Sequence, residues 1–536
     1  MGGEEEIAIE GAPSAVVVAV PISDLENEKD KRPPSPSSDP RARTSPHDDE
    51  VDYYGQRPAC LPSTFQECLF VLTMTVAVGM SSFFGGATLC ILDAVAADLN
   101  MTSAEVTWLN AGQNLAAGTL LLFFGRIADL FGRRPLLIGS MALYTGCVLA
   151  AGFATNAVYI DVFSGMIGIC CAASLPPAIG KLGAVYEKPS YRKNRAFACF
   201  SAGFPTGFVV GAFLAGIATQ LASWRATFWV IAVIYGFFTL AAWWTVPPDT
   251  EQRLGGFNRE TLAQFDFLGA FLAIAGLACL TAALTLGGDA EAWKTPYVPA
   301  LLAIGVVLIP ACVVWQHFCK HPLMPLHVWK DRNFTLLVSA LCLGFYGFSG
   351  NLFWISLVWQ RIDKDSPLWV AIKLLPAAVG GIVVNIAAAL VMHRISNKLL
   401  MFVAAIALVI ASALWSALGP SYSYFELSFP ALIFSVIGCD FQFTVTNMYI
   451  MSSMPSDKQS VAGGLFNTVS RLIAAVGLGV QTSVFNATGG AADGADSLKY
   501  RPYQATFWVA LVGAVLGVVL VPFTTIGTQG ARKTAK

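Results

Sequence analysis

Among the ionisable side chains inside the long apolar runs of this sequence, where a charge is costly, three are candidates for a function. Asp440 and Arg471 fall near the middle of two runs, and Asp161 lies near one end of a third. A charge at the centre of a bilayer costs about 2.5 to 3.5 kcal/mol on insertion scales, so each group needs a partner, water or a ligand. We expect Asp440 to pair with Arg471. Two interpretations stay open: a fixed structural ion pair, or a carboxyl group that exchanges a proton during a functional cycle.

Amide and aromatic side chains accompany these charges in the same runs. Aromatic faces mixed with a few amides suit an amphipathic organic ligand, although aromatic residues in membrane helices also serve as packing or lipid-facing groups. The candidate proton- and substrate-binding residues are therefore Asp440, Arg471, Asp161, Asn351, Gln360, Gln442 and Asn447.

The sequence shows no pattern typical of metal binding, nucleophilic catalysis or nucleotide binding. The five histidines avoid the middle of the apolar runs, and the twelve cysteines form no CxxC pair. No nucleophile–base cluster and no GxxxxGK[ST] phosphate loop is present. We therefore expect no metal, no cofactor and no catalytic residue. Without an ATP-binding motif, any active transport would take its energy from solute or ion gradients.

The composition points to a membrane protein. Of the 536 residues, 55% are hydrophobic and 12% are charged, against about 25% charged in ordinary soluble domains. A soluble enzyme would have to hide most of this chain. The net charge of −1 offers no field that would gather nucleic acid.

Fourteen apolar runs are long enough to be membrane helices, each of which needs about 20 residues. An even number of spans puts both ends on one side. The loops and C-terminal tail on that side carry eighteen lysines and arginines against six on the other, so we expect cytoplasmic termini. The sequons at Asn100 and Asn486 then lie outside, where glycosylation can occur. The runs are 67–92, 106–124, 136–154, 158–184, 197–219, 226–246, 266–287, 298–319, 334–358, 368–392, 399–418, 429–452, 460–485 and 504–527.

The runs divide into two related halves. The turn 125–134 has an eroded copy at 389–398, and the letters ATFWV begin both the sixth run and the fourteenth. Two six-helix halves around a midplane site are typical of transporters. The predicted parts are a disordered cytoplasmic tail 1–65, an N-terminal half 66–246, a loop 247–265, an inserted helix pair 266–319, a loop 320–333, a C-terminal half 334–527 and a tail 528–536.

The turn after the second run is similar to the signature G-x-x-x-D-[RK]-x-G-[RK]-[RK] of the major facilitator superfamily, with Leu130 in place of the first basic residue. The matching gating-motif residues are Gly125, Asp129, Gly132, Arg133 and Arg134. Further stretches, such as Ser223-Trp-Arg225 and Asn467-Thr-Val-Ser-Arg471, resemble the fourteen-span drug:proton antiporters, especially the fungal aminotriazole-resistance-like branch.

This resemblance implies an all-α, polytopic fold and export of an amphipathic small molecule by alternating access, with proton exchange as the coupling of that family. Two charges that relatives carry are replaced here by Phe84 and Ser164. Alternatives therefore stay open: a uniporter, an exporter of a polar metabolite, or a nontransporting receptor on the same fold. We expect a monomer in the lipid bilayer of the cell membrane or the vacuole, with a small molecule as partner. Gly203, Gly207 and Gly211 repeat every four residues and predict close helix packing.

Overall fold

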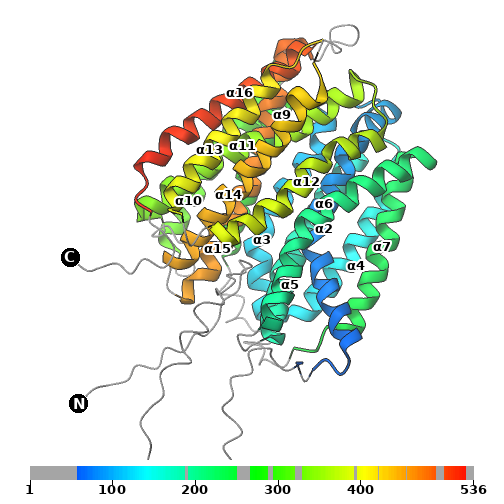
Figure 1. Cartoon of the computed structure of the whole chain (residues 1–536), viewed down its shortest axis with the longest axis vertical. Coiled ribbons are helices and arrows are strands. Elements are labelled where there is room, and N and C mark those ends of the chain that lie inside the picture. Colours follow the sequence, from blue (N-terminus) through cyan, green and yellow to red (C-terminus); the bar gives the residue numbers. More distant parts are fainter. Residues whose placement is uncertain are drawn as a thin grey trace, which may run out of the picture.

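The computed structural model describes residues 57–58, 60–186, 191–249, 266–287, 294–319, 329–391, 395–420, 422–453, 456–490 and 500–526. Within these ranges the side chains of a few helical residues, among them Asp129 and residues 456–465, lie outside the description. All regular structure in the described part of the chain is helical, and fourteen helices there have 19 residues or more (Figure 1). The predicted tails 1–65 and 528–536 fall almost wholly outside the described residues.

The first six long helices alternate in direction and pack against one another. Ser63, Thr102 and Asn156 each cap a helix start by accepting a backbone N–H with the side chain. The six helices are α2 (Thr64–Leu99), α3 (Ser103–Phe131), α4 (Arg133–Ala151), α5 (Ala157–Val185), α6 (Tyr191–Leu221) and α7 (Trp224–Thr245).

A helix pair and six further long helices follow. The pair is α9 (Phe267–Leu286) and α10 (Tyr297–Phe318). The last six are α11 (Arg332–Arg361), α12 (Pro367–Val391), α13 (Asn397–Ser416), α14 (Phe429–Ser453), α15 (Ser456–Phe485) and α16 (Tyr500–Leu520). Short π or 3-10 segments lie at Tyr424–Ser428, Asn486–Gly490 and Val521–Phe523.

Thirteen of the described helices are long and apolar enough to cross a membrane. The other, α3, contains the predicted run 106–124 but is more polar along its length. Its Asn110 and Gln113 are buried, and α3 packs between α5 and α15, so this polar surface avoids lipid. The outer surface of the bundle is apolar, as Val233, Leu240 and Phe318 illustrate with more than 70% of each side chain exposed.

The two groups of six helices meet along three helix pairs: α3 with α15, α6 with α12, and α2 with α11. In Figure 1, α6 and α12 run side by side through the middle of the molecule. The α9–α10 pair lies at one of these seams, because α9 packs against both α3 and α15. Leu115 of α3, Leu277 of α9 and Leu472 of α15 belong to one hydrophobic cluster there.

The glycine repeat of α6 lies against α2, inside the first group of helices. A Cβ atom at Gly203 would stand 2.3 Å from the Thr75 carbonyl oxygen, and one at Gly211 would stand 2.1 Å from the Phe83 carbonyl oxygen. At Gly207 it would meet the Ser82 hydroxyl at 2.8 Å. The two backbones therefore touch along three turns, and this contact lies within one half rather than between the halves.

Candidate functional site

Arg471 projects from the middle of α15 across the seam between the two groups of helices. Its Nη1 donates to the Ser81 hydroxyl of α2 at 2.8 Å. The Gln113 amide of α3 donates to the same hydroxyl at 2.8 Å and to the Ser81 carbonyl at 3.2 Å. Gly118 of α3 allows the approach, since a Cβ there would lie 3.0 Å from Cβ of Arg471. The guanidinium is thus held at the centre of the bundle by neutral groups.

Asp440 lies at similar depth on α14 but faces a different neighbour. Its Oδ2 accepts a hydrogen bond from the Asn385 amide of α12 at 3.2 Å. A Cβ at Gly381 of α12 would lie 3.4 Å from the same oxygen and 3.9 Å from Pro205 of α6. The predicted Asp440–Arg471 pair is therefore wrong for this structure, since each charge has a neutral partner on a different seam.

The four predicted amides separate into different places. Asn351 donates to Ser412 of α13 at 3.1 Å and is buried inside the C-terminal group. Gln442 is also fully buried there, with its Oε1 turned toward Gly344 of α11 and both amide atoms without a partner. Neither borders the seam. Asn447 follows Asp440 by seven residues and so shares its helix face; its Oδ1 is buried without a partner.

Asp161 lies near the start of α5, next to α3. Its Oδ1 is buried without a hydrogen-bond partner, and its carbonyl oxygen lies 3.9 Å from a Cβ built on Gly112. Ser164, one turn further along, donates to the Leu109 carbonyl of α3. Ser164 therefore ties α5 to α3, at the position where relatives were expected to carry an arginine.

Half-buried aromatic residues of α11 and α14 contact one another in the C-terminal group. The ring centroid of Phe345 of α11 lies 6.0 Å from that of Phe348 on the same helix and 6.0 Å from that of Phe443 of α14. By contrast, Trp354 and Trp359 are fully buried, and Trp354 stacks on Phe485 at 4.4 Å. The two tryptophans therefore serve helix packing.

Gln360 and two charged residues join α2 to α11 at one end of the bundle, which we call the Asp93 end. The Gln360 amide donates to the Leu89 carbonyl at 2.8 Å and its oxygen accepts from the Asp93 N–H at 3.0 Å. Arg361 pairs with the Asp93 carboxylate at 2.9 Å. We call Asp93, Gln360 and Arg361 the Asp93 clasp. Thr107 and Thr482 add a hydrogen bond of 2.9 Å between α3 and α15 at this end.

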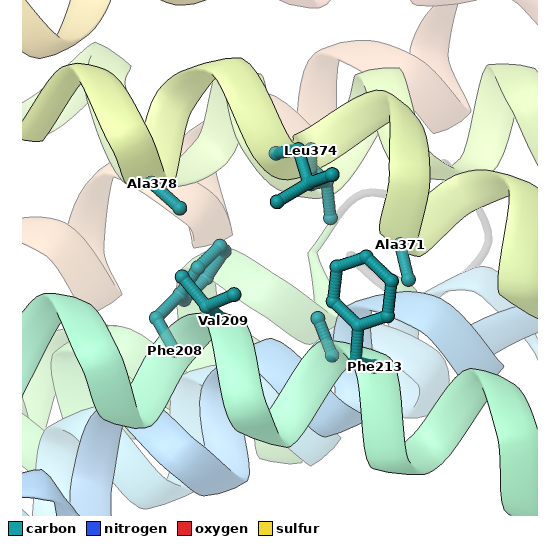
Figure 2. Close-up of a pocket in the computed structure, with 8 residues that line it drawn as sticks. Phe208, Val209, Phe213, Ala371, Leu374 and Ala378 are labelled. Atoms are coloured by element: carbon teal, nitrogen blue, oxygen red, sulfur yellow. The ribbon is translucent and has the colours of Figure 1, made fainter.

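The α6–α12 seam is closed at the Asp93 end by apolar side chains alone. In Figure 2, Phe208, Val209 and Phe213 of α6 point toward Ala371, Leu374 and Ala378 of α12. The crevice between them has no room for a water molecule. It is a seal and not a ligand site.

Toward the opposite end, which carries Arg133, the same two helices are exposed on several sides. On α6 the exposed residues include Ser201, Ala202 and Thr206, which point in different directions around the helix. On α12 they include Asn385 and Ile386. Asn385, the hydrogen-bond partner of Asp440, is therefore exposed on the side of the apolar seal that faces the Arg133 end.

The gating-motif turn is tied to the segment after α7. Gly132 has φ +105°, in the region that favours glycine, and a Cβ there would lie 2.8 Å from Oδ2 of Asp249. That oxygen accepts the Arg134 backbone N–H at 3.1 Å, at the positive start of α4. Asp249 also pairs with Lys181 of α5 at 2.5 Å, and Lys181 is buried.

The contacts of the other motif residues are described only in part. Arg133 donates to the Gly180 carbonyl at 3.2 Å, and a Cβ at Gly125 would only touch Pro176. The side chain of Asp129 lies outside the description. Asp249 was missed by the sequence analysis, although a carboxylate directly after a span, on the side of Arg133 and Arg134, was a usable signal.

A second polar group surrounds Lys373 near the start of α12. Its Nζ bonds Asp363 at 3.5 Å and also Asp365, and it lies 5.4 Å from the Trp359 ring centre. Tyr422, in the loop before α14, donates to Asp363. Burial and this carboxylate raise the pKa of Tyr422, which keeps its hydroxyl protonated. The charge of Lys373 is satisfied locally.

The two sequons differ in setting. Asn100 is exposed and ends α2 in the left-handed conformation, with φ 51°. Oδ1 of Asn486 is buried.

Among the described residues, no three histidine, cysteine or acidic side chains come together as a metal site would need.

The model of the family described as Major Facilitator Superfamily matches residues 69–478. The sequence is 26% identical to the low affinity ammonium transporter of Saccharomyces cerevisiae, over 81% of this chain and 84% of that protein. It is 26% identical to efflux pump terJ of Aspergillus terreus (85% and 88%) and 24% identical to the aminotriazole resistance protein of S. cerevisiae (83% and 82%). The structure is similar in fold to the nucleoside transporter NupG, with a TM-score of 0.59 at 11% identity, over 85% of this chain and 99% of that one.

Proposed function

The chain belongs to the Major Facilitator Superfamily, and we propose that it exports amphipathic small organic molecules by alternating access, in exchange for protons. The resemblance and the all-α membrane fold expected from the sequence are confirmed. The similarity to proteins named efflux pumps supports the direction of transport.

One observation carries the proposal: two charges at mid-depth, Asp440 and Arg471, face the seams and are bound only by neutral groups of the described residues. A protein that used them only for stability would pair them, since an unpaired charge in a low-dielectric interior is costly. A carboxyl group that alternates between ionised and protonated forms is the simplest means of coupling a solute to a proton. We assign this role to Asp440, with Asp161 as the second candidate.

The arrangement of the two ends supports alternating access. The charge bias of the loops favours a cytoplasmic Arg133 end and termini. In that orientation the Asp93 clasp and the apolar crevice close the outer side, and the exposed Asn385, the partner of Asp440, lies on the cytoplasmic side of the crevice. We infer that this is an inward-facing state, as an exporter needs for loading. Exchange with an outward-facing state requires the clasp to open and the Arg133 end to close.

We assign the gating motif to that second step, with Asp129 facing the start of α15 when the Arg133 end closes. In this proposal the halves 66–246 and 334–527 move relative to each other, and 266–319 is an inserted helix pair. Asn100 is the glycosylated sequon of a cell-membrane protein in this proposal. Its removal by mutation should abolish any shift in mobility caused by glycosidase.

The experiment is flux into proteoliposomes with an acidic lumen, where proton exit drives uptake. Two labelled, impermeant probes are used: naphthalene-2-sulfonate and (2-naphthyl)trimethylammonium. We expect uptake of at least one probe to rise with the pH gradient. Asp440→Asn should fold and retain downhill flux but lose its dependence on the gradient, because the amide imitates the protonated acid.

The matched control is Asp98→Asn, which removes a carboxylate at the Asp93 end that pairs with Arg225. It should leave the pH dependence intact. Absence of flux for both probes would contradict transport of such amphipathic ions. Flux by Asp440→Asn that still follows the gradient would remove Asp440 from the coupling and leave Asp161 to be tested in the same way.

A further inference from the structure

Arg471 has hydrogen-bond donors that the protein leaves unused. A guanidinium carries five N–H donors in a planar fork. In the described residues one nitrogen, Nη1, has an acceptor, the Ser81 hydroxyl. The other two nitrogens have neither a partner nor complete burial, in contrast to Nε of Arg134, which is buried without a partner. The N–H groups on these two guanidinium nitrogens are therefore free to bind a ligand inside the bundle.

The Ser81 hydroxyl provides a second free hydrogen-bond donor next to Arg471. Its hydroxyl oxygen accepts from both Arg471 and Gln113 at 2.8 Å, which fills the two acceptor positions of a hydroxyl. The hydroxyl hydrogen must then point away from both donors, and among the described contacts it has no acceptor. Gln113, only 1% exposed, fixes the orientation of Ser81.

No carboxylate balances this group of donors. Arg471 forms no ion pair with any described residue, whereas buried Lys181 has Asp249. The Asp440 carboxylate accepts its hydrogen bond from Asn385 on the other seam. A cation with a free planar fork and an adjacent hydroxyl donor is a matched receptor for a planar or trigonal oxyanion.

We propose that Arg471 and Ser81 bind the anionic group of the transported molecule, so that the substrates are amphipathic organic anions such as carboxylates or sulfonates. Gln113 acts as a positioning residue through Ser81. The half-buried rings of Phe345, Phe348 and Phe443 contact the apolar body of the substrate. This inference rests on the proposed transport function and specifies its substrate class.

The test measures binding by titration calorimetry on the purified full chain in detergent, with three probes of one shape. Naphthalene-2-sulfonate is the anion, naphthalene-2-sulfonamide the neutral isostere and (2-naphthyl)trimethylammonium the cation. A charge-assisted hydrogen bond strengthens binding by about tenfold or more, so the sulfonate should bind at least about tenfold tighter than the sulfonamide.

Three variants separate the contributions. Arg471→Gln should abolish the preference for the sulfonate and leave sulfonamide affinity within about twofold. Arg471→Lys should keep part of the preference, because the charge remains and the fork is lost. Ser81→Ala should weaken sulfonate binding by a few-fold and serves as an independent variant should Arg471→Gln fail to fold. Val512→Ala, on the exposed surface of α16, controls for handling.

The outcomes distinguish failure of the anion-binding inference from failure of the proposed transport function. An undiminished sulfonate preference in Arg471→Gln, or equal binding of sulfonate and sulfonamide by the unmodified protein, would overturn the inference. Uptake of the cationic probe but not of the sulfonate would also overturn it and leave transport intact. Sulfonate preference that depends on Arg471, without flux of any probe, would support the anion site and contradict the proposed transport.

Discussion

Gln360→Leu should shift the protein toward a state open at the Asp93 end. The substitution keeps a similar volume and removes two hydrogen bonds between α2 and α11, to the Leu89 carbonyl and from the Asp93 N–H. Gln360 is only 5% exposed, so solvent cannot fully replace them. At about 1 kcal/mol net for each bond, the closed state loses about 2 kcal/mol. That corresponds to roughly a 30-fold change in the ratio of closed to open molecules.

The Asp93–Arg361 pair stays in this variant. It adds only about 0.2 to 1 kcal/mol, because the Asp93 side chain is 36% exposed. The shift is measured by pulsed electron paramagnetic resonance between spin labels at Thr155 and Ala417, in a background depleted of other cysteines. These exposed positions lie on opposite halves at the Asp93 end.

The expected result is a longer label-to-label distance in a larger fraction of molecules. Gln66→Leu is the matched control, since Gln66 contacts the Trp244 carbonyl within one half. A distance distribution in Gln360→Leu that equals that of the unmodified protein would refute the role of the Asp93 clasp.

Two further predictions concern stability. Lys181→Met leaves Asp249 without its cation and should lower the free energy of unfolding by about 3 kcal/mol or more. The double variant Lys181→Met with Asp249→Asn should recover most of this loss. A melting temperature in detergent that is as high in the single variant as in the double variant, or higher, would contradict this prediction. Gly211→Ala places a Cβ 2.1 Å from the Phe83 carbonyl oxygen and should cost about 1 to 3 kcal/mol, whereas Gly139→Ala, with open space around it, should be tolerated. Equal melting temperatures for the two glycine variants would show that α2 and α6 can separate without cost.

The helices were predictable because a bilayer imposes a length and a composition on each of them. The boundaries were less so: α2 spans Thr64–Leu99 and extends beyond the apolar run 67–92 at both ends, because a helix continues past the hydrocarbon wherever its caps allow. The polar face of α3 lowers its hydropathy without preventing burial, since its neighbours are helices and not lipid.

The charges at the centre were found by the sequence analysis, but their partners were not. Hydropathy gives the depth of a residue and leaves open the direction in which the side chain points. Asp440 and Arg471 share a depth and face different seams. Residue spacing along α14 would have separated Asn447, seven residues from Asp440, from Gln442, which points to the opposite side. The contacts of Ser81 and Gln113 depend on how helices distant in sequence are placed, which no local pattern records.

The packing of α9 against both α3 and α15 has a mechanical consequence. One helix of the inserted pair bridges the two halves along a single seam, and Ser483 of α15 donates to the Leu284 carbonyl of α9 on that side. The α6–α12 seam has no such bridge among the described residues. The α3–α15 side should therefore move least when the two halves rock between the two states, the largest displacement should occur at α6 and α12, on the side of Asp440, and Arg471 should move little.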